Sequence, residues 1–230
     1  ASGGTLSNLM ALVTARERLD QGSDGVVVCS RDAHVSLTKA ARVMGLRKDA
    51  LISLPVDDRG RLSAVAVQET LSRLKAEGRP CIAVVATAGT TVRGAIDPLP
   101  ALAKICRDAA AWLHIDAAIG GVFALSPIHA SLMEGINQAD SITLNPQKLL
   151  GITKTSSLLL LRESGQLHQT FSTGLPYMEP ASLSDHGGET GIQGTRPAEV
   201  LKLWLGLRQL GNNGIERTLS GALQLSLIHI

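Results

Sequence analysis

The sequence predicts an α/β fold built on a mostly parallel sheet with helices on both faces. Short apolar runs alternate with segments of helical periodicity along the 230 residues, and continuous apolar runs are typical of strands buried on both faces. Hydrophobic residues make up 44% of the chain and aromatic residues only 2%. We therefore expect a core of Leu, Val, Ile and Ala.

The first part of the chain alternates helix and strand. The apolar run 26–29 predicts the first strand, residues 35–44 predict a helix that Gly45 ends, and the run 51–54 predicts a second strand. Before them, residues 5–20 predict a helix because apolar side chains gather on one side, at Leu6, Leu9, Met10, Leu12 and Val13.

The same alternation continues through the middle of the chain. Residues 63–76 predict a helix, and the run CIAVVAT at 81–87 predicts a buried strand. A helix over 99–109 follows Asp97-Pro98, which places the proline near its first turn.

Three further strands and one long helix are expected after that. The strands are predicted at 112–116, 141–144 and 157–161, and the helix runs over 197–210 and stops at Gly211. Between the last of these strands and the helix, the Gly- and Ser-rich stretch 172–194 predicts a long loop. Loops of that length in compact domains are usually functional or disordered.

Both ends of the sequence look cut. The chain starts without methionine, already inside a Gly-Gly motif, and its last six residues, LSLIHI, resemble the translated end of a sequencing library. We expect 1–205 to form a large domain, 206–224 to begin a smaller C-terminal domain, and 225–230 to be a scar. A short natural strand is the alternative for the last segment.

Composition excludes several classes of function. The net charge of +2 is spread without basic runs, so nucleic acid is not an expected partner. No apolar stretch approaches the roughly 20 residues of a membrane helix, and no signal peptide is present. Cys29, Cys81 and Cys106 form no CxxC pair and are interpreted as buried thiols in a reducing compartment. We therefore expect a soluble, cytoplasmic protein.

Candidate functional residues follow the predicted strands, and ligands bind beyond the carboxyl ends of such strands. A strand-end carboxylate next to small residues, as at Asp116, suits a flat ligand, although a helix cap or a structural salt bridge is an alternative. The other candidates are His34, Thr90, Thr91, Ser141, Asn145 and Lys148.

Two further segments bear on ligand binding, one on phosphate and one on metal. Gly3-Gly4-Thr5 precedes the first helix, so free backbone N–H groups and the helix dipole are suited to a phosphate, or the motif is only a turn and cap. No nucleotide P-loop or GxGxxG motif follows a strand. His114 shares a strand face with Asp116, but no third ligand of suitable spacing is evident, so no metal is expected.

Lys148 stands beside the apolar pair Leu149-Leu150, and a charged lysine among apolar groups is costly. We interpret it as a desolvated lysine, because burial favours the neutral amine. A phosphate cradle, a strand-end aspartate and such a lysine together are what pyridoxal 5'-phosphate requires. The lysine would form a Schiff base, and Asp116 would keep the pyridine nitrogen protonated.

Six stretches carry a more specific resemblance: SGGTLSNLMAL, SRDAHVSLTKAARVMGL, VVATAGTTVRGAIDPL, WLHIDAAIGG, ADSITLNPQKLLG and IQGTRPAEVLKLWL. In this order they resemble the group II pyridoxal-phosphate-dependent amino acid decarboxylases, which include glutamate, aromatic amino acid and diaminobutyrate decarboxylases. The resemblance implies a PLP fold type I, aspartate aminotransferase-like large domain with a seven-stranded sheet, lacking its N-terminal part.

The resemblance implies a role for each matching residue. Lys148 matches the Schiff-base lysine and Asp116 the partner of the pyridine nitrogen. Ala118 matches the residue against one ring face, and His34 the histidine stacked on the other, near the substrate carboxylate. The remaining cofactor contacts are implied for Gly4, Thr5, Thr91, Ser141, Asn145 and Gln147.

The implied reaction is decarboxylation of an L-amino acid to the corresponding amine and carbon dioxide, in a homodimer with an interfacial active site. Other enzymes of this fold, a carbon–carbon lyase or an aminotransferase, are the alternative, as is an inactive fragment. Two departures from the family pattern are evident. Gln147 stands where histidine is usual, and the only tyrosine, Tyr177, precedes the expected loop, which leaves His186 as a candidate proton donor.

Overall fold

The computed structural model describes residues 1–19, 24–174 and 187–228. The strands are β1 (Val26–Ser30), β2 (Leu51–Leu54), β3 (Cys81–Thr87), β4 (Trp112–Asp116), β5 (Ser141–Leu144) and β6 (Leu158–Leu161). The α-helices are α1 (Gly4–Glu17), α2 (Ser36–Val43), α3 (Ala64–Ala76), α4 (Leu99–Asp108), α5 (Gln166–Phe171) and α6 (Glu199–Ile228). Short 3₁₀ segments are η2 (Gly120–Leu125), η3 (Ala130–Met133), η4 (Ile136–Gln138) and η6 (Gly187–Thr190).

One mixed sheet organises the fold, in the order β2-β1-β3-β4-β5-β6. The first five strands are parallel, and β6 pairs antiparallel with β5. The six strands predicted from apolar runs are therefore confirmed, each to within one residue. The seventh strand implied by the resemblance is not among the described residues, since their other extended segments make only the isolated bridges Val56–Leu62 and Ala88–Ile96.

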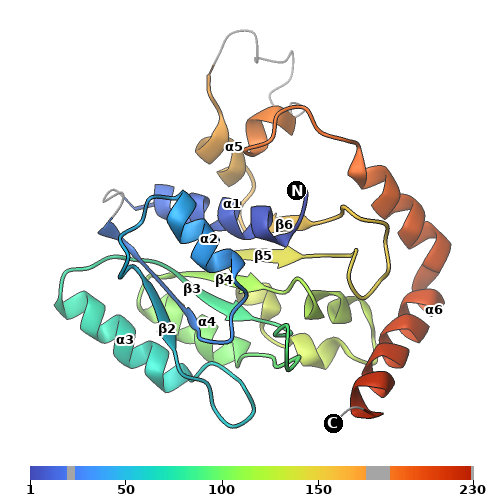
Figure 1. The fold of residues 1–230 in the computed structure, drawn as a ribbon, viewed down its shortest axis with the longest axis horizontal. Helices are drawn as coiled ribbons and strands as arrows, with labels where there is room; N and C mark the ends of the chain where they lie inside the picture. Colours follow the sequence, from blue (N-terminus) through green and yellow to red (C-terminus); the bar gives the residue numbers. More distant parts are fainter. Residues whose placement is uncertain (20–23, 175–186, 229–230) are drawn as a thin grey trace.

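Helices cover both faces of the sheet, as predicted (Figure 1). Alternating strand residues divide the core, because successive side chains point to opposite faces. Val27, Val85 and Trp112 pack with α1 and α2 on one face. Residues of the other parity, such as Val84 and Leu113, pack with α3 and α4 on the opposite face.

The chain reverses direction across the sheet between β1 and β3. From β1 it passes outward to β2, and then returns to place β3, β4 and β5 on the other side of β1. In open α/β sheets, ligands bind at such a reversal, in a crevice beyond the carboxyl ends of the strands. The order of the strands alone therefore indicates a ligand site at this edge of the sheet.

The last helix differs from its prediction. Helical geometry breaks at Gly211 (φ 57°, ψ 179°), where the sequence predicts a stop, but a second helical segment follows to Ile228. Glycine tolerates this left-handed φ at little cost. The second segment returns to the body, where Leu219 is buried and Glu216 accepts a 2.6 Å hydrogen bond from Ser126. In Figure 1 α6 is the orange-to-red helix.

The predicted loop over 172–194 is described only at its ends. At these ends Glu189, which is buried, accepts hydrogen bonds from the backbone N–H of Thr173 at 2.7 Å and from its hydroxyl at 3.1 Å. The end of the loop is therefore held against its beginning. Tyr177 and His186 lie outside the described residues.

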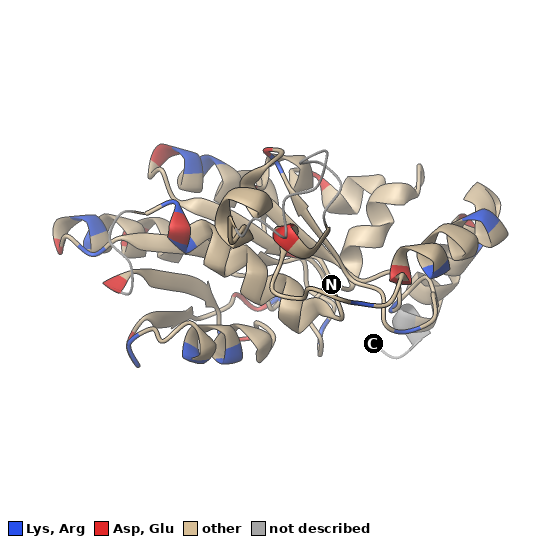
Figure 2. Cartoon of the chain, turned by 90° about the horizontal axis from the view of Figure 1, so that it is seen from above, with Lys and Arg blue, Asp and Glu red and all other residues tan. Residues whose placement is uncertain are grey.

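Charges are spread over the molecule. Figure 2 shows basic and acidic residues interspersed over the peripheral helices and loops. None of the helices in the described ranges has the length and apolar character that crossing a bilayer would need.

The three cysteines are free thiols. Cys29 and Cys106 are buried as predicted, whereas Cys81 is only partly buried at the start of β3. Burial raises the pKa of Cys29 to about 11 and the pKa of the other two to about 12. All three therefore remain protonated and unreactive at neutral pH.

Asp97 joins two segments beneath the site. Its carboxylate accepts 2.7 Å hydrogen bonds from the backbone N–H groups of Leu62 and Thr87, so it ties the turn before α3 to the end of β3. The side chain is buried at 2% exposure. Burial raises its pKa to about 6, although the two backbone donors act in the opposite direction. The sequence resemblance assigned Asp97 no role, and the contacts assign it a structural one.

The raised pKa of Asp97 predicts a pH-dependent contribution to stability. Because the pKa of about 6 in the folded protein lies above the ordinary value of 3.8 for an aspartate, protonation of this carboxyl favours the folded state. This contribution is complete below about pH 4 and is lost as the pH rises through about 6. Relative to Asp97→Asn, the wild-type free energy of unfolding should fall by roughly 2–3 kcal/mol between about pH 4 and pH 7.

Urea unfolding of both proteins across this pH range measures the difference. The Asp97→Asn protein also loses a hydrogen-bond acceptor, but that loss is a constant offset, so only the trend with pH is diagnostic. A difference that stays constant with pH would contradict the raised pKa.

Candidate active site

A cavity of about 510 Å³ opens beyond the carboxyl ends of β1, β3, β4 and β5, next to the first turn of α1. Nine of the residues predicted from sequence line it: Gly4, Thr5, His34, Thr91, Asp116, Ala118, Asn145, Gln147 and Lys148. They come from distant parts of the chain, and the sheet topology brings them together.

The first turn of α1 forms one wall of the cavity, through Ser2, Gly3, Gly4 and Thr5. Its first backbone N–H groups have no acceptor within the helix, and the helix dipole favours an anion there. Glycine avoids a close contact at position 4, because a Cβ there would lie 2.9 Å from the end of the Asn145 side-chain amide. This wall therefore suits a phosphate group.

Asn145 is held by its neighbours. Its amide lies 2.6 Å from the Ser157 hydroxyl. In the orientation that satisfies both ends of the amide, the nitrogen donates to Ser157 and the oxygen accepts from the Gly4 backbone N–H at 3.3 Å. Asn145 thus connects the end of β5 to the start of α1.

Asp116 ends β4 and reaches the cavity floor, with only 6% of the residue exposed. Its Oδ2 accepts a 2.8 Å hydrogen bond from Asn8, and its Oδ1 accepts one of 3.2 Å from the backbone N–H of Ala118. These donors compensate for the burial of a charged group. Asp116 therefore presents an oriented carboxylate to a ligand.

Asn8 was missed by sequence reasoning. It lies on the buried side of α1, lines the cavity and bonds directly to Asp116. The available signal was its position in SGGTLSNLMAL, where a polar residue stands among the apolar side chains that define the buried side of the helix. A buried polar residue needs a partner, and this one has Asp116.

Ser141 does not line the cavity. It begins β5, whereas the cavity lies beyond the other end of that strand. Its hydroxyl accepts a 2.8 Å hydrogen bond from the Trp112 indole and lies 2.8 Å from His114 Nδ1. The phosphate contact that the resemblance implies for Ser141 therefore has no support in this geometry.

The expectation that Lys148 is desolvated by its leucine neighbours is wrong. Lys148 lines the cavity and is exposed, while Leu150 is buried and Leu149 packs on the core formed with α3 and α4. The turn closed by the bond from Lys148 N–H to the Asn145 carbonyl (3.0 Å) directs the leucines inward and the amine toward the cavity. The leucines therefore anchor the lysine and do not cover it.

The side-chain amide of Gln147 uses its oxygen in a hydrogen bond within the protein. Its Oε1 accepts a 2.6 Å hydrogen bond from the backbone N–H of Ser156. Because that bond fixes the orientation of the amide, its NH₂ group is the free end for a ligand in the cavity that Gln147 lines. The cavity thus has an uncharged hydrogen-bond donor, the Gln147 amide, at the position where the family usually has histidine.

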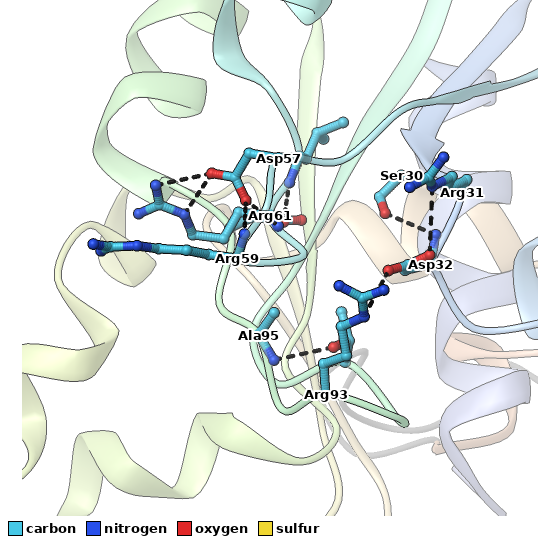
Figure 3. Close-up of polar contacts among 11 residues, drawn as sticks. Ser30, Arg31, Asp32, Asp57, Arg59, Arg61, Arg93 and Ala95 are labelled. Carbon is cyan, nitrogen blue, oxygen red and sulfur yellow. Dashed lines mark hydrogen bonds and ion pairs between the residues drawn. The ribbon is translucent and has the colours of Figure 1, made fainter. Parts of the chain in front are cut away.

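His34 and Thr91 lie on loops at the cavity rim. The backbone N–H of Ser36 donates to His34 Nδ1 at 3.2 Å, which leaves Nε2 to carry the ring proton in the neutral form. Figure 3 shows the two loops joined by Asp32 and Arg93, whose charged groups are 3.8 Å apart. This partly exposed pair contributes little energy but links the loops.

Thr87 supplies a test of ligand fit. It lines the cavity at the end of β3, is 4% exposed, and its hydroxyl has no hydrogen-bond partner among the described residues. An unpaired buried hydroxyl beside a cavity is expected where a polar ligand binds. Together with a phosphate-binding helix turn, a buried carboxylate and an amine, this donor set fits pyridoxal phosphate.

Comparison with known proteins decides the family. The model of the pyridoxal-dependent decarboxylase conserved domain matches residues 1–228. This chain belongs to that family. The L-2,4-diaminobutyrate decarboxylase of Rhizobium meliloti (strain 1021) is 39% identical over 229 residues, which cover 97% of this chain and 46% of the relative.

Solved structures agree with this membership. The crystal structure of mouse CSAD superposes with a TM-score of 0.92 at 34% identity, covering 98% of this chain and 49% of that one. Oryza sativa TDC, crystallised with PLP and tryptamine, gives a TM-score of 0.87 at 26% identity, covering 94% and 47%. The chain thus spans about half the length of the relatives that it matches.

Gly120 provides a stability test at the cavity. Its backbone N–H donates to the Ala88 carbonyl at 2.9 Å, and a Cβ added at Gly120 would lie 2.6 Å from that oxygen. Gly120→Ala should push away the segment after β3, which includes the cavity residue Gly89, and lower the free energy of unfolding by roughly 1–3 kcal/mol. Urea unfolding measures this loss.

Gly221→Ala is the matched control. Gly221 lies in α6, where an added Cβ meets no atom within 4 Å. The substitution should leave stability unchanged or raise it by up to about 1 kcal/mol. Equal stability of the two variants would contradict the close approach at Gly120.

Proposed function

We propose that this chain forms the cofactor-binding part of a pyridoxal-phosphate-dependent decarboxylase, which converts an L-amino acid to its amine and carbon dioxide. One observation carries the proposal: the Lys148 amine, the Asp116 carboxylate and the first turn of α1 border the same cavity. Family membership supports the same chemistry.

When bound, pyridoxal phosphate supplies an aldehyde that reacts with amines and a ring that withdraws electrons from the substrate. In this proposal Lys148 provides the amine of attachment, and Asp116 accepts the hydrogen bond of the protonated ring nitrogen. The first turn of α1 and Gln147 hold the phosphate, with Asn145 beside them. Ala118 and His34 would lie against the ring of the cofactor, and Thr91 would contact it as well.

The substrate is proposed to be an α-amino acid whose carboxylate lies near His34. The amine of Lys148 returns to release the product, and the cavity walls limit water. The donor that protonates the α-carbon is proposed to be His186, in the loop that follows Tyr177. The matched relatives are named as decarboxylases, which favours loss of the carboxylate over transamination or carbon–carbon cleavage.

Wider assignments are also proposals. We propose 1–205 as the cofactor-binding domain and 206–224 as the beginning of a smaller one, within a homodimer whose active site lies at the interface. A cytoplasmic location is supported by the three free thiols. The similar proteins carry names for both diaminobutyrate and cysteine sulfinic acid, so amino acids of both kinds belong in a test of substrates.

Lys148→Ala should abolish covalent capture of the cofactor. After incubation with pyridoxal phosphate and reduction with borohydride, mass spectrometry should place the label on the wild-type peptide that contains Lys148. The variant should retain less than about a tenth of this label. Its release of carbon dioxide should fall by roughly a thousandfold, as expected for loss of a group that transfers protons.

Lys104→Ala is the control, because Lys104 is an exposed lysine that pairs with Asp108 on the surface of α4. It should keep both label and activity. Carbon dioxide release is measured against a panel of basic, acidic and aromatic amino acids. Specific labelling of Lys148 without carbon dioxide from any substrate would reject the decarboxylase assignment for this chain and leave a cofactor-binding piece.

A further inference from the structure

A row of buried polar side chains lies beneath Asp116 and outside the cavity. Trp112, His114 and Ser141 are at most 2% exposed, and none of them lines the cavity. They bond to one another and, through Asn8, to Asp116. Contact with a ligand does not explain their presence, so another role is needed.

The directions of these hydrogen bonds are constrained at both ends of the row, by the Trp112 indole and by the Asp116 carboxylate. Trp112 Nε1 is only a donor, so the Ser141 hydroxyl oxygen, 2.8 Å away, accepts. The single proton of that hydroxyl is then free to donate to His114 Nδ1, also at 2.8 Å. The opposite direction, with the ring proton on Nδ1, is disfavoured because Nε2 would then need a donor, whereas the Asn8 NH₂ group is already directed at Asp116. His114 Nδ1 is therefore the acceptor.

This arrangement selects one form of His114. Its ring is fully buried, and burial lowers its pKa to about 4 against the opposing influence of the Asp116 charge. The ring is thus neutral at physiological pH, with its proton on Nε2. That atom lies 3.1 Å from Asn8 Oδ1, to which it donates.

The orientation of the Asn8 amide agrees with this form of the histidine. With Oδ1 accepting from His114, the NH₂ group faces Asp116 Oδ2 at 2.8 Å and the Ser36 hydroxyl at 2.9 Å. The opposite orientation would place the amide oxygen against the carboxylate and the NH₂ group against the donor of His114. Both contacts would then be repulsive.

We propose that Trp112, Ser141, His114 and Asn8 form a one-way hydrogen-bond relay that orients the Asp116 carboxylate toward the cavity. The four are positioning residues, and only Asn8 among them borders the cavity. The part of the proposal in which Asp116 meets the ring nitrogen of the cofactor rests on the proposed function.

The register of the sheet builds the relay. Trp112 and His114 are two residues apart in β4, so their side chains share a face. His114 stands opposite Ser141 in the parallel pairing of β4 and β5. Helix α1 covers that face and brings Asn8 to the far side of the ring. A shift of one residue in either strand would break the sequence of donors.

The tautomer of His114 tests the relay without any cofactor. In protein labelled with ¹⁵N at its six histidines, nitrogen chemical shifts report which ring atom carries the proton, and His114→Gln identifies the His114 signals. We expect a neutral Nε2–H ring with no titration between about pH 5.5 and 8. In Ser141→Ala this single form should give way to a mixture.

An Nδ1–H ring, a titrating ring, or an unchanged tautomer in Ser141→Ala would overturn the relay. Because this measurement uses the chain alone, its outcome is separate from that of the proposed function.

The second test measures how Asn8 acts on the bound cofactor. Asn8→Leu should weaken binding of pyridoxal phosphate about tenfold or more, the loss expected for a hydrogen bond to a charged group, and should change the visible absorbance that reports ring protonation. Likewise His114→Phe should weaken binding, whereas His114→Gln, whose amide can still donate to Asn8, should restore most of it.

Thr14→Val is the control on the same buried side of α1, where the Thr14 hydroxyl has no partner among the described residues. It should bind the cofactor with wild-type affinity and absorbance. If Asn8→Leu matched Thr14→Val in both readouts, the relay would have no role in orienting Asp116. Failure of the wild-type chain itself to bind the cofactor would instead reject the proposed function.

Discussion

The burial of a carboxylate at the end of β4 is the constraint on which the rest of the site depends. A charge that is 6% exposed requires hydrogen-bond donors on its protein side. Asp116 receives them from Asn8 and from the Ala118 backbone. This requirement explains why the buried side of α1 carries Asn8 among its apolar residues. It also explains why the face of β4 below Asp116 carries His114 in place of an aliphatic residue.

The sheet forms the rigid part of the site, and many of the functional side chains lie at strand ends and in the loops that follow them. Four parallel strands end at one edge, and the reversal between β1 and β3 opens a crevice there. Apart from the residues of α1 and its first turn, the residues that contact this crevice lie at strand ends or in the loops that follow them, so backbone pairing in the sheet helps to fix their positions. The Asp97 carboxylate extends this rigidity to the end of β3 by holding the Thr87 backbone. The site is therefore shaped before a ligand enters it.

Much of this arrangement could be predicted from the sequence, because apolar runs mark buried strands and polar residues that follow them mark the ligand edge. The six strands and several cavity residues, such as His34, Asp116 and Asn145, follow from these patterns, whereas Ala118 and Gln147 were assigned only through the family resemblance. The exposure of Lys148 does not follow from them, since periodicity does not tell which way two leucines turn after a tight bend. Ser141 was assigned to the ligand although it starts its strand. Asn8 and Asp97 act through contacts with distant segments, which local patterns do not reveal.

The two leucines that follow Lys148 have a mechanical consequence. Leu150 lies in the core, so the backbone at Lys148 is held by packing on the side opposite to the cavity. The lysine stem itself has four carbons and free torsions. Motion of the amine is therefore confined to side-chain rotation about a stationary pivot. An amine on such a tether can swing between two bonding partners on the timescale of rotamer changes, without any rearrangement of the fold that carries it.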